Sequence, residues 1–305
     1  RWLVHNYMKP GEGDFDSVDR DAGIRAILGV GADFDYEIIS KEDWYGRRLI
    51  ASKFRDRCAF IAGDAAHIWV PYAGYGMNAG IADATNLSWL LSAHLNGWAP
   101  AAILDAYEAE RWPITSQVSR FAMSHAEAEI RRRGSVPEEI EHEGAIGAHA
   151  REEVGRLTYE INVRQYACAG LNFGSYYDRS PIIAYDAGQP PPYTMDSYTP
   201  WTVPGCRTPH LWCKDGSSLY DAMGPEFTLL RFDASIDVAP LGAAARNRGL
   251  PLKILDVNRP ASTKPDGDSL VLSRPDQHVA WRSNRLPVDC LALIDRVRGA
   301  ANQAQ

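Results

Sequence analysis

The 305-residue chain lacks a C-x-x-C pair, a long apolar run and an excess of basic residues. Its five cysteines are scattered and none has the spacing of a zinc site, so reduced cytoplasmic thiols are the simplest interpretation. No run approaches the roughly 20 apolar residues that cross a bilayer, and the first residues show no signal-peptide pattern. The net charge of -7 argues against nucleic acid or an anionic membrane as the main partner. Function must therefore be sought in small-molecule chemistry.

The first part of the chain predicts strands followed by helices. With 45% hydrophobic and 23% charged residues, the composition is that of a globular protein. The apolar residues Phe34, Tyr36 and Ile38 alternate with acidic ones, which favours antiparallel strands over about residues 1–60. The unbroken apolar run 58–62 predicts a buried strand that ends at a turn. Apolar residues at helical spacing then predict two helices within about residues 61–165.

The last part of the chain predicts a second, smaller domain. Residues 166–195 are rich in Tyr, Asp, Gly and Pro and predict a linker, because the run 188–192 continues neither a helix nor a central strand. Residues 196–305 predict an α/β domain. Its expected elements are strands at 227–232, 252–257, 270–273 and 278–282, and a terminal helix at 287–298. The fold class expected for the whole chain is α/β (α+β), with a first domain over 1–165.

One stretch carries the residue types of a ligand site. Gly63 and Asp64 follow the apolar run, and glycines at 74 and 76 precede a helix that opens at Met77. An exposed carboxylate accepts charge-assisted hydrogen bonds from polyol hydroxyls, and glycines let a backbone approach a flat ring. Free N–H groups at a helix N-terminus favour negative charge on the ligand. Taken on physical grounds alone, this is an anion or polyol site.

The same stretch resembles a known motif. Over most of residues 44–125 the chain is similar to the second FAD motif of the group A flavoprotein monooxygenases, the relatives of para-hydroxybenzoate hydroxylase and phenol hydroxylase. The residues that carry the resemblance are Arg57-x-x-Phe60-Ile61-Ala62-Gly63-Asp64-Ala65-Ala66-His67, Pro71-x-x-Gly74-x-Gly76-Met77-Asn78-x-Gly80-x-x-Asp83-Ala84-x-Asn86-Leu87-x-Trp89 and Leu104-Asp105-x-Tyr107-x-x-Glu110-Arg111-x-Pro113.

The resemblance implies roles for single residues. Asp64 would bind the ribityl chain of FAD, and Pro71 would lie beside the reactive edge of the isoalloxazine ring. Gly74 would let the main chain approach that ring. The pyrimidine edge of the ring would meet the backbone of Gly76-Met77-Asn78. The alternative interpretation is an ordinary turn aspartate followed by a tight glycine turn.

The resemblance also implies an activity. It is that of an FAD-dependent, NAD(P)H-using monooxygenase that hydroxylates a phenolic aromatic substrate through a flavin C4a-hydroperoxide, as in phenol degradation. The sequence names no catalytic base. His67 is interpreted as a residue that positions the loop, with a catalytic base as the alternative. Trp69, Tyr72 and Tyr75 are candidates for the substrate pocket, and packing is the alternative for each.

A second resemblance covers the tail of the chain. Residues 203–210, 215–230 and 274–282 are similar to the C-terminal thioredoxin-like domain of phenol hydroxylase relatives. Its implied role is structural or in subunit contact, for example in a homodimer. The missing C-x-x-C argues against thiol–disulfide chemistry, although Cys206 and Cys213 remain an alternative redox pair.

The dinucleotide motif expected with such a site is missing. No strand is followed by the G-x-G-x-x-G turn that holds a pyrophosphate, and Gly29-x-Gly31 lacks the third glycine. We therefore expect the adenosine and pyrophosphate half of the FAD site upstream of Arg1 or on another chain. Two rival functions stay open at this point. One is a flavin-dependent halogenase or reductase, and the other is a non-catalytic assembly fragment.

Overall fold

The structure is a computed structural model that describes residues 1–8, 13–71, 74–258 and 268–301. It divides into two compact units, Arg1–Gly46 and Arg47–Gln305. Each unit is described by itself. No helix in the described part of the chain is long and apolar enough to cross a membrane.

The first unit is helical. It contains the 3-10 turn η1 (Phe15–Ser17) and the helix α1 (Arg20–Leu28). The side chain of Asp19 caps α1 by accepting a hydrogen bond from the N–H of Ala22, and Gly29 ends it in the left-handed conformation at φ 65°. These two capping residues explain why a helix forms here.

The strands predicted for residues 1–46 are not formed. Among residues 1–8 and 13–46 the structure has no strand, and the segment that holds Phe34, Tyr36 and Ile38 pairs with no other strand. That part of the prediction was wrong. Alternation reports which side chains are apolar, whereas a strand also needs a neighbour that accepts its backbone hydrogen bonds. Tyr36 instead donates its hydroxyl proton to Asp21.

The second unit begins with short antiparallel pairs. Strand β1 (Leu49–Ile50) pairs with β4 (His67–Ile68), and β2 (Arg55–Asp56) pairs with β3 (Ala59–Phe60). The antiparallel prediction is confirmed in this stretch, but the buried strand predicted over 58–62 is only two residues long. Cys58 is exposed, because a two-stranded ribbon covers few of its own side chains.

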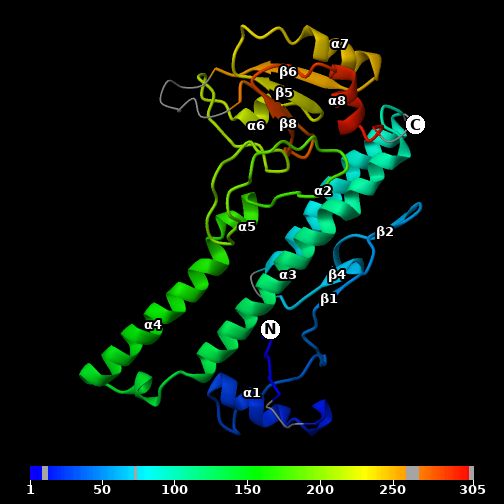
Figure 1. Cartoon of the computed structure of the whole chain (residues 1–305). Helices are drawn as coiled ribbons and strands as arrows, with labels where there is room; N and C mark the ends of the chain where they lie inside the picture. The colour runs from blue at the N-terminus through cyan, green and yellow to red at the C-terminus, as the bar shows by residue number, and fades with distance from the viewer. Residues whose placement is uncertain (9–12, 72–73, 259–267, 302–305) are drawn as a thin grey trace. The chain divides into compact units, whose positions relative to one another are not determined.

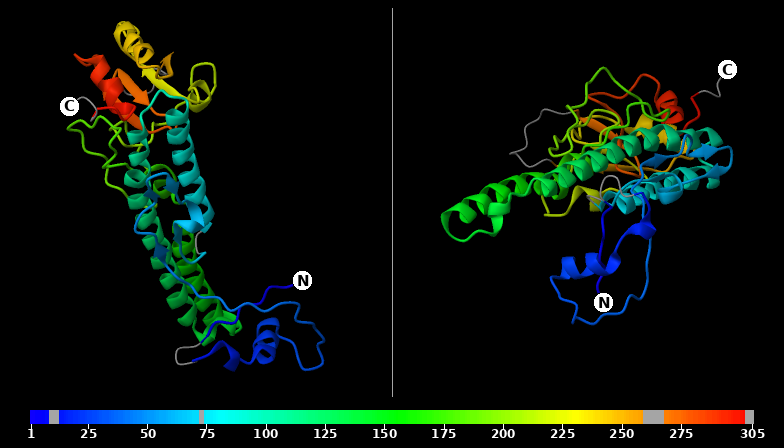
Figure 2. Two further views of the ribbon diagram at one scale, coloured as in Figure 1. Left: turned by 90° about the vertical axis from the view of Figure 1, so that its right-hand side faces the viewer. Right: turned by 90° about the horizontal axis from the view of Figure 1, so that it is seen from below.

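Two long helices form the middle of this unit, and Figures 1 and 2 show them side by side. They are α2 (Tyr75–Leu95) and α3 (Asp105–Gly134), joined through the 3-10 turn η4 (Ala101–Leu104). A further turn, η5 (Glu138–Glu141), leads to α4 (Gly144–Tyr166). Both helices predicted within residues 61–165 are confirmed, and α3 continues through Pro113.

The C-terminal part contains a four-stranded mixed sheet with the strand order β6-β5-β7-β8. Its strands are β5 (Phe227–Arg231), β6 (Leu252–Asp256), β7 (Leu270–Ser273) and β8 (Val279–Ser283). β5 and β6 are parallel, and the other two pairings are antiparallel. The helices of this part are α6 (Leu219–Ala222), α7 (Ala239–Asn247) and α8 (Cys290–Val297). All four predicted strands and the terminal helix are confirmed.

One hydrophobic core joins the helices and the sheet. The ring of Phe227 on β5 meets Trp89 of α2 and Trp98 edge-on, with ring centroids 6.0 and 6.1 Å apart. The segment predicted as a linker contains the short helix α5 (Ala169–Phe173), and Ile182 and Ile183 in it are fully buried. The segment therefore packs as part of the interior. The domain boundaries 1–165, 166–195 and 196–305 stay predictions.

Candidate functional site

The Gly63–Asp64 turn lies directly against helix α2. It forms the 3-10 turn η2 (Gly63–Ala65), and Gly63 has φ 56°, a conformation that favours glycine. A Cβ placed on Gly80 of α2 would lie 3.2 Å from the Cα of Gly63, so both glycines permit the close approach. The side chain of Asp64 is exposed. The turn thus presents a carboxylate to solvent while its backbone rests on the helix.

The buried carboxylate of Asp83, on α2, anchors this turn to the helix. Its Oδ2 accepts a hydrogen bond from the N–H of Gly63 at 3.2 Å and lies 2.6 Å from Nε2 of His67. Its Oδ1 accepts a hydrogen bond from Nε of Arg111 at 2.9 Å. Burial alone would raise the pKa of Asp83, but the hydrogen bond from His67 and the charge of Arg111 hold it below its ordinary value. Asp83 is therefore an ionised anchor.

His67 contacts the anchor and does not face solvent. Its side chain is buried, its ring stacks on Trp69 with centroids 5.0 Å apart, and its Nδ1 has no hydrogen-bond partner among the residues that the structure describes. These contacts support the interpretation of His67 as a loop-positioning residue.

The start of α2 presents open backbone. Gly74 precedes the helix at φ 65° without a side-chain cap, and the amide of Asn78 donates to the Gly74 carbonyl at 3.0 Å. A Cβ on Gly76 would meet no described atom within 4 Å, and Met77 is 74% exposed. Because Gly76 precedes Gly80 by four residues, both lie on one helix face, and the Asp64 turn and the open N-terminus share one side of α2.

The predicted site residues therefore fall into two groups. Those predicted to bind the cofactor lie in the Gly63–Asp64 turn or around the start of α2, where Asp64, Pro71, Gly74, Met77 and Asn78 are exposed and Gly76 is partly exposed. Of the predicted substrate residues, Tyr72 lies outside the described residues. Trp69 and Tyr75 are half-buried against a small core cluster, and Tyr75 is hydrogen-bonded to Cys168. Their role towards a substrate stays a prediction.

A second buried charged cluster adjoins the first and escaped the sequence analysis. The guanidinium of Arg274 binds both oxygens of Glu110, at 2.5 and 2.7 Å, and both oxygens of Asp276, at 3.0 and 2.6 Å. Burial alone would raise the pKa of Asp276, but the charge of Arg274 holds it well below its usual range. Glu110 and Arg274 both lie in motifs quoted from the sequence, but no local pattern pairs two residues that lie 164 positions apart.

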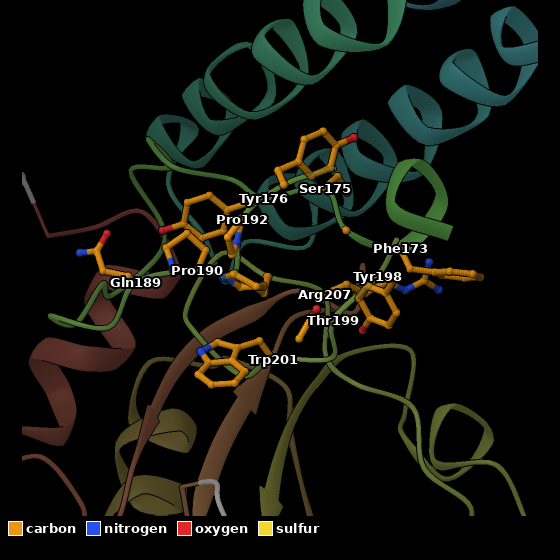
Figure 3. A pocket seen from close by; sticks show the side chains of 14 residues that line it. Phe173, Ser175, Tyr176, Gln189, Pro190, Pro192, Tyr198, Thr199, Trp201 and Arg207 are labelled. Atoms are coloured by element: carbon orange, nitrogen blue, oxygen red, sulfur yellow. The ribbon is translucent and has the colours of Figure 1, made fainter. Parts of the chain in front are cut away.

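A separate cavity of about 280 Å³ is lined by residues of the segment 173–207, many of them aromatic residues or prolines. Tyr176, Tyr198 and Trp201 line it, and Figure 3 shows Arg207 at one end. Cys206 also lines the cavity, and burial raises the pKa of its thiol to about 11. A thiol with that pKa is protonated at neutral pH, which disfavours Cys206 and Cys213 as a redox pair.

An exposed carboxylate on a glycine turn and a helix N-terminus beside it have the features of a site for a polyol or an anion. Comparison with known families agrees. The FAD binding domain family matches residues 9–122, and the family described as aromatic-ring hydroxylase, C-terminal, matches residues 201–301. The chain therefore carries the FAD-binding and C-terminal domains of the FAD-dependent aromatic hydroxylases, which confirms the resemblance found in the sequence.

Individual relatives agree with this family. The chain is 31% identical to the FAD-dependent monooxygenase opdD of Penicillium oxalicum, over 93% of this chain and 56% of that protein. It is 30% identical to a phenol 2-monooxygenase of a Pseudomonas species, over 90% of this chain and 51% of that protein. The rebeccamycin biosynthetic enzyme RebC with reduced flavin superposes with a TM-score of 0.80 at 32% identity, covering 95% of this chain and 54% of RebC. The chain thus spans about half the length of the relatives it matches.

Proposed function

We propose that the complete protein is an FAD-dependent, NAD(P)H-using monooxygenase that hydroxylates a phenolic aromatic substrate. The observation that carries this proposal is the exposed Asp64 carboxylate on a turn held against α2 by the buried Asp83. The similarity to a phenol 2-monooxygenase supports the substrate class.

The residues present fit a flavin. Gly76 leaves open space where a Cβ would stand, which allows a flat ring to approach the backbone. Asp64 would accept hydrogen bonds from the ribityl hydroxyls, and Pro71 would border the ring. The N–H groups at the start of α2 would face the pyrimidine edge, where the positive end of the helix dipole stabilises negative charge. When bound, the flavin supplies the electron transfer and oxygen activation that no side chain provides.

The protein's own residues have a positioning role in this proposal. Asp83 accepts the hydrogen bond of the Gly63 N–H and so holds the turn in which the neighbouring Asp64 is exposed. Trp69 and Tyr75 pack against a small buried cluster of apolar side chains, which excludes water from that part of the protein. We assign no proton transfer to any residue of this chain.

The rest of the dinucleotide site is part of the proposal. We propose that residues outside this chain hold the pyrophosphate and adenosine, because the chain has no G-x-G-x-x-G turn and its relatives are about twice as long. We also propose that residues 196–305 form a thioredoxin-like domain with a structural role or a role in subunit contact. Its mixed four-stranded sheet supports this assignment.

The test uses the full-length protein. Purified protein is expected to show visible flavin absorbance and substrate-stimulated NADPH consumption with a phenol, with a product one oxygen heavier by mass spectrometry. A coloured protein without such stimulation by any phenol would favour a halogenase or reductase. A colourless preparation that does not take up added FAD would favour an assembly role.

A variant of Asp64 tests the site itself. Replacing Asp64 by alanine removes a charge-assisted hydrogen bond of about 1.5–3 kcal/mol, so the Kd for FAD is expected to rise about 10- to 150-fold. Asp56→Ala is the matched control, because Asp56 is an exposed aspartate on the nearby strand β2. Equal FAD affinity of the two variants would remove Asp64 from the site.

A further inference from the structure

A buried path of hydrogen bonds and of charge and ring contacts runs from the Gly63–Asp64 turn to the C-terminal sheet. It begins at the Gly63 N–H, which donates to Asp83, and Asp83 in turn accepts from Arg111 of α3. The side chains of Asp83 and Arg111 are 0% and 5% exposed. Solvent therefore does not screen this first part of the path.

The path continues through Tyr177. Arg111 interacts electrostatically with the Tyr177 side chain, and the guanidinium of Arg274 lies 5.3 Å from the centre of the same ring. The ring of His278 stacks on the same tyrosine, with ring centroids 4.2 Å apart. Tyr177 thus lies between α3 and the turn that joins β7 to β8.

The path ends in the bidentate pairs of Arg274. Glu110, the neighbour of Arg111 on α3, receives two hydrogen bonds from Arg274, and Ser180 donates to the same carboxylate at 2.5 Å. The side chains of Arg274 and Glu110 are 0% exposed. The turn between β7 and β8 is therefore tied to α3 at the point where α3 also holds Asp83.

Stability alone is a weak reason for such an arrangement. Burying ions is costly, and replacing a buried ion pair by apolar side chains of similar volume is often neutral or stabilising. The planar fork of an arginine on a carboxylate does fix orientation, because two parallel hydrogen bonds permit one geometry. The bidentate contacts of Arg274 are therefore better explained by the orientation that they fix than by a gain in stability.

We propose that Arg274 is a positioning residue for the flavin site. Through Glu110, Tyr177 and Arg111 it fixes Asp83, and Asp83 fixes the turn that carries Asp64. The C-terminal domain would thereby set the geometry of the flavin half-site. This inference rests on the proposed function, since it takes Asp64 to be a flavin ligand.

The first test needs no flavin. In hydrogen–deuterium exchange, the peptide that contains Gly63 is expected to lose protection at least tenfold in Arg274→Met. Ile294→Ala is the control, because Ile294 is fully buried on α8 and its truncation lowers stability without removing a charge. Wild-type protection of Gly63 in Arg274→Met would overturn the inference.

The second test uses the FAD-loaded full-length protein. Arg274→Lys keeps the charge but loses the fork, and the triple variant Glu110→Gln, Arg274→Met, Asp276→Asn removes the guanidinium together with both carboxylate charges that it pairs. Both are expected to fold, to change the visible circular dichroism of bound flavin and to raise the Kd for FAD at least tenfold. Ile294→Ala is expected to match the wild type in both readouts below its melting temperature.

The outcomes separate the two proposals. If the wild-type protein binds FAD, and both Arg274 variants bind it with a Kd within twofold of the wild type and with the same flavin spectrum, only the positioning role is overturned. Wild-type protein that does not bind FAD would overturn the proposed function, and this inference with it. A triple variant that regains stability but keeps the altered flavin spectrum would support positioning over a structural role.

Discussion

Replacing Gly80 by alanine tests how closely the Gly63–Asp64 turn approaches α2. The new Cβ would stand 3.2 Å from the Cα of Gly63, which is backbone and yields only if the turn moves. The same substitution at Gly155, in the interior of α4, would meet no described atom within 4 Å. The two variants differ in this contact while sharing the same helix chemistry.

The magnitude follows from two opposing terms. Alanine is favoured over glycine in a helix interior by about 0.8–1 kcal/mol, and this gain applies to both variants. Overpacking against backbone costs about 1–3 kcal/mol, and it applies only at Gly80. Gly155→Ala is therefore expected to raise the free energy of unfolding, and Gly80→Ala to lie about 1–3 kcal/mol below it.

Urea and thermal unfolding of the two variants measure this difference. The melting temperature of Gly80→Ala is expected to lie roughly 2 °C or more below that of Gly155→Ala. FAD affinity should fall in Gly80→Ala alone, because the displaced turn carries Asp64. If Gly80→Ala stabilises the protein as much as Gly155→Ala does, the close approach and the reasoning built on it are wrong.

Three further predictions concern acid stability, thiol reactivity and the shared core. The pKa values of Asp83 and Asp276 lie below the ordinary 3.8 in the folded protein, so their contribution to stability is complete above about pH 4 and is lost as the pH falls below it. Urea midpoints from pH 7 to 3 should fall steeply at the acid end, and less steeply in Asp276→Asn. With iodoacetamide at pH 8, exposed Cys58 should label first and Cys206 only after unfolding, since its pKa is about 11; equal rates by mass spectrometry would contradict this. Phe227→Ala should cost about 3–5 kcal/mol in one cooperative transition, and separate tryptophan-fluorescence and circular-dichroism transitions would argue against a shared core.

The candidate site was recognisable because its residues are close in sequence. Asp64, Gly76 and Asn78 occur at fixed spacing around a turn and the start of a helix. Their positions there depend on local backbone conformation and not on contacts with distant residues. Trp69 and Tyr75 show the limit of such reasoning, because an aromatic side chain near a helix start can face a pocket or a core. The contacts of Tyr75 with Cys168 come from a segment far along the chain.

The sequence by itself determined the elements with strong local signals. Apolar runs and helical periodicity were enough for α2, α3 and the four strands of the C-terminal sheet, because each depends on side chains a few residues apart. The caps Asp19 and Gly29 are equally local signals, but the prediction of strands over about residues 1–60 included the stretch where helix α1 forms, so it was wrong there.

Only the tertiary structure decided which distant groups meet. It paired Glu110 with Arg274 across 164 positions and buried Ile182 within a segment that is polar and proline-rich. The physical reason is that a buried charge is tolerated only beside its counter-charge, and a local pattern does not specify where in the chain that counter-charge lies. The link between the Gly63–Asp64 turn and the C-terminal sheet is therefore a property of the folded chain.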